Sequence, residues 1–328
     1  MSRVLSPREL SDLLSSPLLA EQTSVVRQGA DACLIVDLSA GDLSPLDGLT
    51  SAGCPVIGFR PSGTAEIPGV VDVLAATEEE LELLRAAVSR NPRAATVLMQ
   101  VLRHNEAASV ADGLLAESLA YSTLQHGQEF QRWLQERPTS ARGADRAADP
   151  VLLVREQDRL TLTLNRPEKH NAYSADMRDA LVAGLHVALA DATVRCVTLR
   201  GAGASFCAGG DLDEFGAARD GAEAHLSRTT RSAAALLHRL APRTVCELHG
   251  ACIGAGIELP AFAGRVAARE DSLFALPEVS MGLIPGAGGT VSILRRIGRH
   301  RAAFMALSGM QIDAVTASAW GLIDEVVA

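Results

Sequence analysis

The pattern of apolar and polar positions divides the chain into two regions joined by a polar stretch. Residues 136–150 read ERPTSARGADRAADP, with proline near both ends and no large apolar side chain. Small and charged residues between prolines are typical of an exposed linker. We therefore predict a first domain over residues 1–136, a linker over 137–150 and a second domain over 151–328.

The second region alternates strand-like and helix-like patterns. VLLVREQDRLTLTLNRP places apolar residues on both sides of Gln157-Asp158, which predicts a hairpin of residues 151–155 and 160–164. Further strands are predicted over 194–199, 244–248 and 266–268, and helices over 176–190, 221–240, 256–263 and 290–297. This alternation predicts an α/β fold built in layers.

The first region also mixes strands and helices. Buried strands are predicted over 32–38 and 55–59, and helices over 78–89 and 92–104. One long helix is predicted over 111–137, where apolar residues recur at helical spacings. They are Leu114, Leu115, Leu119, Tyr121 and Leu124, followed after an interruption near Gly127 by Phe130 and Leu134. The first region is therefore expected to be an α/β region that ends in long helices.

Length and hydropathy indicate the kind of protein. The 328 residues allow about two domains, and a hydrophobic content of 48% allows a substantial core. Mean hydropathy is +0.15, yet no apolar run approaches the roughly 20 residues that span a bilayer. The first residues, MSRVLSPRELSDLL, are too polar for a secretory signal. We predict a cytoplasmic protein with no membrane partner.

Charge and cysteine content remove further classes. The net charge is −9 and no basic cluster is present, which argues against a nucleic-acid partner. Lys169 is the only lysine. The six cysteines are scattered without a Cys-Xaa-Xaa-Cys pair, which indicates reduced, mostly buried thiols. We predict neither a metal site nor a redox cofactor.

Two glycine-rich segments offer candidate backbone donors. In SFCAGGDL (205–212), small residues let a ligand approach the N–H of Gly210. In HGACIGAGIEL (249–259), Ala255 lies at a predicted helix start, where N–H groups lack partners and the helix dipole is positive. Two such donors form an oxyanion hole. The alternatives are an ordinary glycine turn for the first segment and close helix–strand packing for the second.

Two glutamates offer candidate acid–base groups. Glu258 ends the second glycine-rich segment, and Glu278 lies in FALPEVSMGLIPGAGGT (274–290) among apolar residues. An apolar setting raises the pKa of a carboxyl group, so that it can act as an acid near neutral pH. The alternative for Glu278 is a partly exposed glutamate paired with an arginine. Paired carboxyls beside backbone donors suit proton transfer next to a polarised carbonyl.

Taken in order, four segments resemble the signature segments of the enoyl-CoA hydratase/isomerase (crotonase) superfamily. They are NRPEKHNAYSADM, SFCAGGDL, HGACIGAGIEL and LPEVSMGLIPGAGGTVSILRRIG, and the resemblance runs from about Val151 to Ala328. It implies a crotonase-like spiral of ββα units, an acyl-CoA partner and a trimeric or hexameric homo-oligomer. Gly210 and Ala255 fall at the family's two oxyanion-hole positions, although Ala255 stands where glycine is usual.

The same resemblance implies an activity. Glu258 and Glu278 match the two catalytic carboxyls of hydratases, which favours a lyase that adds water to a 2-enoyl-CoA thioester. The alternatives are an isomerase or another enolate-forming acyl-CoA enzyme, and a non-catalytic acyl-CoA-binding or assembly subunit. Coenzyme A enters only as part of the substrate.

Coenzyme A contacts follow from the resemblance as well. Ala208, Asp211 and Leu212 match positions near the adenine and pantetheine, and Lys169 is placed to approach the phosphates. The alternative for Lys169 is a solvated turn residue. Asp213 departs from the family, because many relatives carry lysine there.

Residues 117–138, ESLAYSTLQHGQEFQRWLQERP, resemble the terminal helix that family members carry after the catalytic core. Here the segment precedes the core. We therefore expect a permuted or fused chain, in which residues 1–136 form a degenerate crotonase-like region whose last helices supply the lid and the trimer interface. The alternative is an unrelated helical cap.

Overall fold

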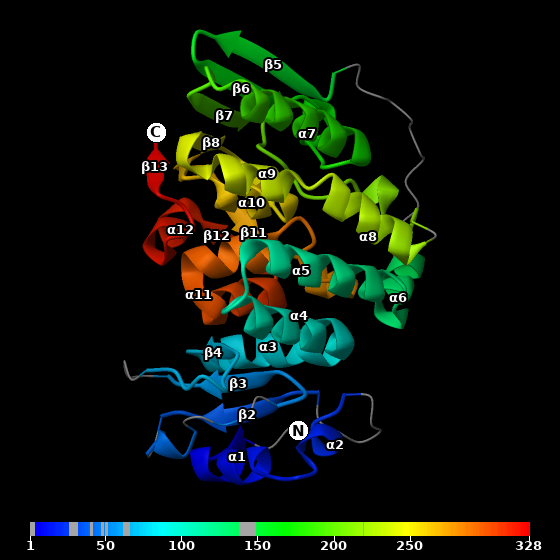
Figure 1. Cartoon of the computed structure of the whole chain (residues 1–328). Coiled ribbons are helices and arrows are strands. Elements are labelled where there is room, and N and C mark those ends of the chain that lie inside the picture. The colour runs from blue at the N-terminus through cyan, green and yellow to red at the C-terminus, as the bar shows by residue number, and fades with distance from the viewer. Residues whose placement is uncertain are drawn as a thin grey trace.

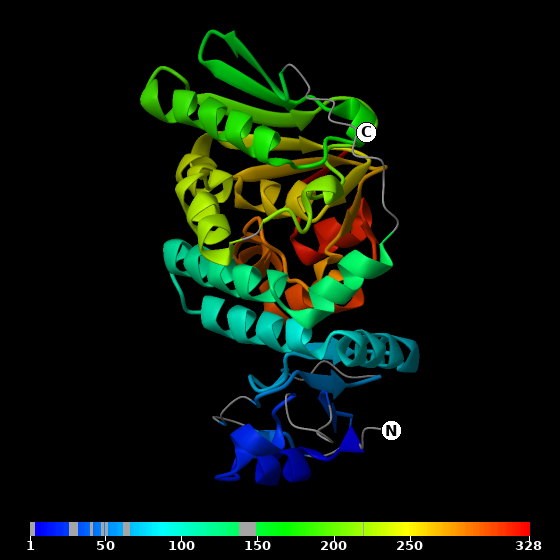
Figure 2. The ribbon, with the colours of Figure 1, turned by 90° about the vertical axis from the view of Figure 1, so that its right-hand side faces the viewer.

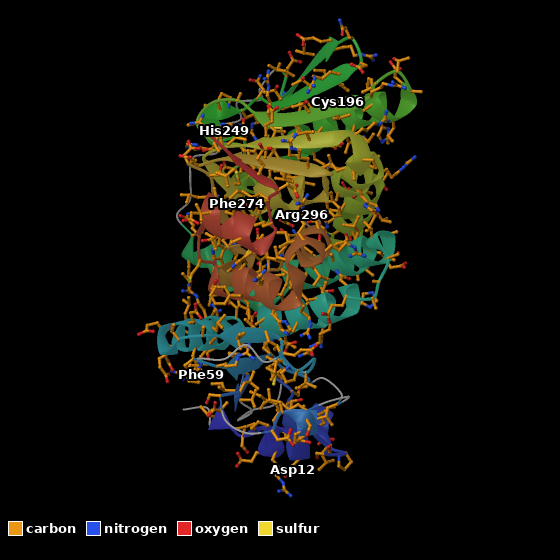
Figure 3. All side chains as sticks on the ribbon, turned by 90° about the vertical axis from the view of Figure 1, so that its left-hand side faces the viewer. Asp12, Phe59, Cys196, His249, Phe274 and Arg296 are labelled. Atoms are coloured by element: carbon orange, nitrogen blue, oxygen red, sulfur yellow. The ribbon has the colours of Figure 1, made fainter. Side chains whose placement is uncertain are left out.

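The computed structural model describes residues 4–25, 32–39, 42–46, 49, 52–61, 66–137, 149–218 and 220–328. The chain is built as a stack: a small N-terminal sheet, a layer of helices, and a larger C-terminal α/β unit (Figure 1). Figure 3 shows the same order along the long axis, with Asp12 and Phe59 at one end and Cys196 at the other. Most of the predicted linker, residues 138–148, lies outside the described residues.

The larger sheet has six strands in the order β13-β10-β8-β7-β6-β5. Its neighbours are parallel except for the antiparallel hairpin of β5 and β6. The strands are β5 (Val151–Glu156), β6 (Arg159–Leu164), β7 (Cys196–Gly201), β8 (Thr244–Leu248), β10 (Arg265–Arg269) and β13 (Glu325–Val327). The hairpin and the strand over 244–248 are confirmed.

A second sheet, β12-β11-β9, runs beside the first. Its strands are β9 (Ala251–Ile253), β11 (Leu273–Ala275) and β12 (Ile312–Asp313). The chain passes from β8 to β9 and then into α10 (Ala255–Glu258). One turn later it passes from β10 to β11 and then towards α11 (Gly289–Ser308). A strand–strand–helix unit is therefore repeated. An isolated parallel β-bridge, formed by the backbone at Cys207 and Cys252, aligns the segment after β7 with β9.

The other C-terminal helices are α7 (Ala175–Ala190), α8 (Gly221–Thr230), α9 (Ala233–Leu240) and α12 (Ala314–Trp320). The helix predicted over 176–190 is confirmed. The single helix predicted over 221–240 is wrong, because the side chain of Ser232 accepts a hydrogen bond from the N–H of Ala235 at 3.1 Å and starts a new helix there.

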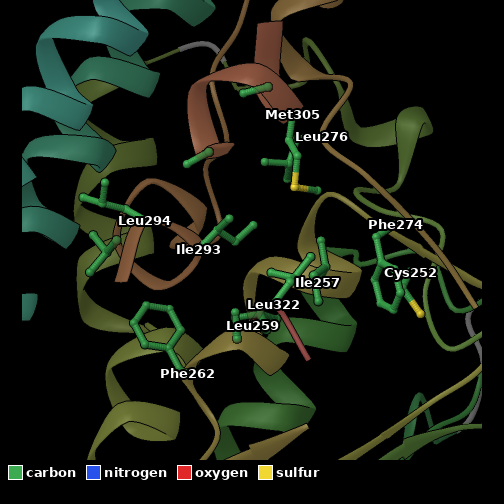
Figure 4. Packing of buried hydrophobic residues seen from close by; sticks show 14 of the residues in the cluster. Cys252, Ile257, Leu259, Phe262, Phe274, Leu276, Ile293, Leu294, Met305 and Leu322 are labelled. Carbon is green, nitrogen blue, oxygen red and sulfur yellow. The ribbon is translucent and has the colours of Figure 1, made fainter. Parts of the chain in front are cut away.

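Two other helix predictions need correction. The helix predicted from Gly256 is short, because Pro260 has no N–H to continue it, and α10 ends at Glu258. The helix predicted over 290–297 continues as α11 to Ser308, through a kink at Gly298. Buried side chains of these elements, including Ile257 and Ile293, lie in one cluster (Figure 4).

The N-terminal sheet is parallel, in the order β1-β2-β3-β4, and has its own small core. Its elements are β1 (Val4–Leu5), α1 (Pro7–Leu14), α2 (Leu19–Gln22), β2 (Leu34–Asp37), β3 (Val56–Phe59) and β4 (Val73–Ala75). The predicted strands over 32–38 and 55–59 correspond to β2 and β3. The outer strands β1 and β4 have only two and three residues, too few to give a hydrophobic pattern.

Four helices lie between the N-terminal sheet and the C-terminal α/β unit (Figure 2). They are α3 (Glu78–Arg90), α4 (Pro92–Asn105), α5 (Val110–Gln125) and α6 (Gln128–Glu136). The predictions of α3 and α4 are confirmed. The single helix predicted over 111–137 is wrong. Gly127 has extended backbone angles and begins α6, so the interruption in the apolar stripe marks a break between two helices.

This helical layer and the C-terminal unit share one hydrophobic core, which includes Met99 of α4 and Phe130 of α6. Helix α5 packs close against α11 at Gly113, where a Cβ atom would lie 2.9 Å from a methyl carbon of Val291. No helix in the described ranges is long and apolar enough to cross a membrane.

One structural detail occurs in both halves. Asp72 precedes β4 and accepts a hydrogen bond from the N–H of Val56, in the neighbouring strand β3, at 2.8 Å. Asp324 precedes β13 and accepts from the N–H of Val266, in the neighbouring strand β10, at 2.7 Å. Both strand pairs are parallel, and each aspartate pairs with an arginine of α11.

Candidate active site

Glu258 is held at the end of α10, with only 2% of the residue exposed. The chain enters α10 through Gly254, whose φ of 50° and ψ of −120° suit glycine. One carboxyl oxygen of Glu258, Oε2, accepts hydrogen bonds from the N–H groups of Ala287 at 2.8 Å and Gly289 at 2.9 Å. These two donors stabilise the carboxylate form, since both lie at the start of α11, where the helix dipole is positive.

Glu278 begins a short 3₁₀ helix, η6 (Glu278–Met281). Its Oε2 is buried and has no hydrogen-bond partner in the described part of the chain. A Cβ atom at Gly254 would lie 2.4 Å from Oε1 of Glu278 and 3.8 Å from Oε1 of Glu258. The two carboxyls therefore flank Gly254 and face the same space.

The environments of the two carboxyls favour different protonation states. Burial raises the pKa of Glu278 well above its usual range, and the nearby Glu258 raises it further. Burial also raises the pKa of Glu258, but the N–H groups of Ala287 and Gly289 oppose that rise. Glu278 without a partner is therefore suited to carry a proton, whereas Glu258 is suited to be the carboxylate.

Backbone donors face the same cavity. Gly210 and Ala255 both line a cavity of about 550 Å³, together with Glu258 and Glu278. None of the hydrogen bonds among the described residues uses the N–H of Gly210 or of Ala255 as its donor. Two unused N–H groups opposite two carboxyls can bind a carbonyl oxygen and stabilise negative charge on it.

The four residues expected near coenzyme A lie outside this cavity. Lys169 Nζ pairs with Asp213 Oδ2 at 2.7 Å. Asp211 is buried and pairs with Arg166 at 2.9 Å. Ala208 and Leu212 are exposed, and none of the four lines the cavity. Asp213 thus partly neutralises the charge of Lys169.

Glu117 of α5 is a site residue that sequence reasoning missed. It lines the cavity, is 2% exposed, and accepts hydrogen bonds from Gly288 N at 2.7 Å, Thr290 N at 2.9 Å and Thr290 Oγ1 at 2.6 Å. Burial, and then the charge of Glu258, raise its pKa. The sequence pattern could have indicated it, because Glu117 shares the helical face of Leu114, Tyr121 and Leu124, where a charged residue is unexpected.

Tyr121 and Arg228 complete this wall of the cavity. The Arg228 guanidinium lies over the Tyr121 ring, 4.9 Å from its centroid. Its Nε and Nη2 also donate to the Ser118 Oγ and Ser118 carbonyl oxygen of α5, at 3.1 and 3.2 Å. Arg228 thus attaches α5 to α8 across the cavity mouth.

A layered α/β fold, with carboxyls and unused N–H groups around one cavity, is typical of enzymes that act on carbonyl compounds. A family profile described as enoyl-CoA hydratase/isomerase matches residues 156–328. The chain belongs to this family. The resemblance given by the signature segments is therefore confirmed.

Two curated relatives from Escherichia coli K12 match over 176 residues. The 1,2-epoxyphenylacetyl-CoA isomerase is 39% identical, and the match covers 52% of this chain and 67% of the isomerase. The 2,3-dehydroadipyl-CoA hydratase is 36% identical, with 54% of this chain and 68% of the hydratase covered.

A solved structure shows the same fold. The enoyl-CoA hydratase of Mycobacterium smegmatis is 34% identical and has a TM-score of 0.51, with 55% of this chain and 70% of that chain covered. The predicted crotonase-like fold is thereby confirmed for the C-terminal half.

Proposed function

We propose that the protein is a 2-enoyl-CoA hydratase. One observation carries this proposal: Glu258 and Glu278 flank Gly254 in a cavity that also holds the unused N–H groups of Gly210 and Ala255. Hydration of a conjugated thioester needs two proton-transfer groups and a site for oxyanion charge, and this cavity supplies both.

In the proposed reaction, the N–H groups of Gly210 and Ala255 bind the thioester oxygen and stabilise enolate charge. Each donor contributes about 3 kcal/mol to transition-state stabilisation. Glu258 accepts a proton from water as the water oxygen attacks Cβ, and Glu278 donates its proton to Cα. The double bond and one O–H bond of water are lost, and a C–O and a C–H bond form.

We propose that the coenzyme A moiety lies outside the cavity, along residues 208–213. Ala208 and Leu212 are exposed there, and Lys169 offers a positive charge at 30% side-chain exposure. The paired Asp213 reduces that charge, so the phosphates must compete with a carboxylate for Lys169.

A 2-enoyl-CoA assay tests the hydratase proposal through loss of the conjugated chromophore. The wild type should hydrate short enoyl-CoAs. Glu258→Gln and Glu278→Gln should each lower kcat by about 100-fold or more, because each removes one proton-transfer group while keeping the side-chain shape. A wild type that leaves a panel of enoyl-CoAs unchanged contradicts the proposal.

Isomerisation of an enoyl-CoA is a second candidate, because the matching family profile covers both hydratases and isomerases. Moving a proton between carbons needs one acid–base group, so one of the two glutamate variants would then keep most of its activity. Product analysis separates a hydrated ester from a shifted double bond. Tight binding of an acyl-CoA without turnover would instead favour a non-catalytic binding or assembly subunit.

We also propose that residues 1–136 are a degenerate crotonase-like region fused ahead of the core at 151–328. Support comes from the matching arrangements of Asp72 and Asp324, each between parallel strands and paired with α11. The position of α5 over the cavity is what a transposed lid requires. Assembly as a trimer or hexamer remains part of the proposal, and light scattering of the purified protein tests it.

A further inference from the structure

We propose that Glu117 is a positioning residue of the acid–base site, contributed by the N-terminal region. It acts by fixing residues 287–290, the same backbone segment that holds Glu258. This inference rests on the proposed function for its effect on catalysis, but its structural part can be tested without any activity.

Successive backbone N–H groups donate alternately to Glu258 and to Glu117. Four successive N–H groups lead into α11, and they are shared between two carboxyl groups. Ala287 and Gly289 donate to Glu258, whereas Gly288 and Thr290 donate to Glu117. The first N–H groups of a helix have no partner inside the helix, so each carboxyl satisfies the donors that the other cannot reach.

This alternation couples the two glutamates through the backbone. Removing the carboxyl of Glu117 leaves two buried N–H groups without an acceptor, and the segment must move to find new ones. Ala287 and Gly289 lie on either side of Gly288, so such a movement displaces the donors that set the Glu258 carboxyl. Small displacements of a catalytic group reduce the rate strongly.

The N-terminal region places Glu117 rigidly. Asn105, the last residue of α4, donates through Nδ2 to the Thr290 hydroxyl at 3.0 Å, and that hydroxyl donates to Glu117. Gly113, one turn before Glu117, packs against Val291. One turn after it, Tyr121 packs under Arg228. The carboxyl is therefore held from α4, α8 and α11 together.

The charged and titratable groups near Glu117 are Glu258, Glu278, Tyr121 and Arg228. The carboxylate of Glu117 raises the pKa of Glu278, after the larger effects of burial and of Glu258. Glu117→Gln should therefore lower the pKa at which Glu278 loses its proton, and the alkaline limb of the pH–rate profile should move to lower pH.

Glu129 provides a matched control. It is 3% exposed and accepts hydrogen bonds from Arg93 N and Ala94 N, both at 2.9 Å, at the start of α4. Glu129→Gln therefore damages a buried helix start in the same way, but its donors belong to α4 and not to the segment that holds Glu258. Thr290→Val serves as a milder variant if Glu117→Gln does not fold, because it removes only the hydroxyl donor.

The first measurement is steady-state kinetics. Glu117→Gln should lower kcat by about 10- to 100-fold with KM changed by less than about 3-fold, because it misplaces Glu258 without removing a substrate contact. Glu129→Gln should keep kcat within about 2-fold of the wild type. Equal kcat values for the two variants, or an alkaline limb that does not move, would overturn the proposal.

The second measurement is amide hydrogen exchange over residues 286–291, which needs no substrate. In Glu117→Gln, exchange should accelerate at all four amides, including those of Ala287 and Gly289. Acceleration confined to Gly288 and Thr290 would show that Glu258 holds its segment alone, and the inference would be wrong. If hydration itself fails in the wild type, this result still decides the structural coupling.

Discussion

At the scale of single residues, the chemistry depends on how three buried carboxyls are partnered. Glu258 and Glu117 accept hydrogen bonds from N–H groups at the start of α11, whereas Oε2 of Glu278 has no partner among the described residues. Hydrogen-bond donors favour the carboxylate and isolation favours the acid. Three similar side chains are thereby given different protonation tendencies within one cavity.

The pH–rate profile should follow from this difference. Burial raises the pKa of Glu258 to about 7, so the rate should rise as pH increases through that value and Glu258 ionises. The rate should fall at higher pH, where Glu278 loses its proton. Because the carboxyls interact, the two apparent pKa values belong to the group of carboxyls and not to single residues.

Glu258→Gln tests whether the charge of Glu258 raises the pKa of Glu278. It should abolish the acidic limb in its residual activity and move the alkaline limb to lower pH, because the Glu258 charge that raises the pKa of Glu278 is gone. The measurement is kcat/KM across the pH range for wild type and variant. A wild-type rate that stays constant around pH 7 would exclude Glu258 as the titrating base.

Which of these residues the sequence could predict depends on how they are positioned. Glu258 and Glu278 follow glycine-rich or proline-containing segments of the core, and their local sequence marked them. Glu117 lies on a helix more than one hundred residues earlier, and its donors are backbone groups of α11. Only the tertiary fold reveals these donors, although a glutamate on an apolar helical face already indicates a buried carboxyl group that needs partners.

At the scale of elements, strong local patterns gave correct strands and helices. The β5–β6 hairpin has apolar residues on both sides of a polar turn, and β8 matches its prediction at both ends. The failures lie where one residue ends a helix. Gly127 separates α5 from α6, and the hydrophobic pattern showed this only as an interruption of the apolar stripe. Pro260 stops α10, and this effect leaves no mark in a hydrophobic pattern.

Gly254, the residue that starts α10, should be intolerant of any side chain. Gly254→Ala adds a Cβ atom that would lie 2.4 Å from Glu278 Oε1, at a φ of 50°. The carboxyl must then move, so kcat should fall by about 100-fold.

Gly298→Ala is the matched control in α11. Its φ is 78°, but no heavy atom lies within 4 Å of the added Cβ. Like Gly254, it has backbone angles that only glycine adopts readily, so Gly298→Ala should cost about 1–3 kcal/mol of stability and keep its activity. Thermal unfolding of both variants measures the cost of the strained backbone, and steady-state kinetics measure the effect of the steric clash between the new Cβ atom and Glu278. Equal kcat values would show that contact with Glu278 is unimportant.

At the scale of the whole molecule, a buried charge cluster joins the N-terminal sheet to the rest of the chain, beside the hydrophobic core that they share. Asp72 is 0% exposed and pairs with Arg103 of α4 at 2.5 Å and with Arg299 of α11 at 2.9 Å. Arg299 Nη2 also donates to the carbonyl oxygen of Gly69 at 2.6 Å. This cluster therefore joins the N-terminal sheet, at the residue before β4, to α4 of the helical layer and to α11 of the C-terminal unit.

Asp72→Ala should therefore destabilise the protein far more than the equivalent change at Asp324. The first variant leaves the guanidinium of Arg103 without its carboxylate and that of Arg299 with only the half-exposed Glu106, a loss of about 3–5 kcal/mol. Asp324 has the same arrangement, an N–H donor at 2.7 Å and an arginine of α11, but its side chain is 43% exposed. Asp324→Ala should cost about 1 kcal/mol.

Denaturant unfolding gives the two free energies, and hydrogen exchange shows where the loss occurs. In Asp72→Ala, protection should fall first in β2 and β3, which also pack in the separate small core of the sheet, while α5 and α11 keep theirs. Similar small losses in both variants would show that the charge cluster does not hold the sheet. Loss of protection in α5 together with β3 would instead mean that the α5 wall of the cavity depends on the N-terminal sheet, so that residues 1–136 support the site as one unit.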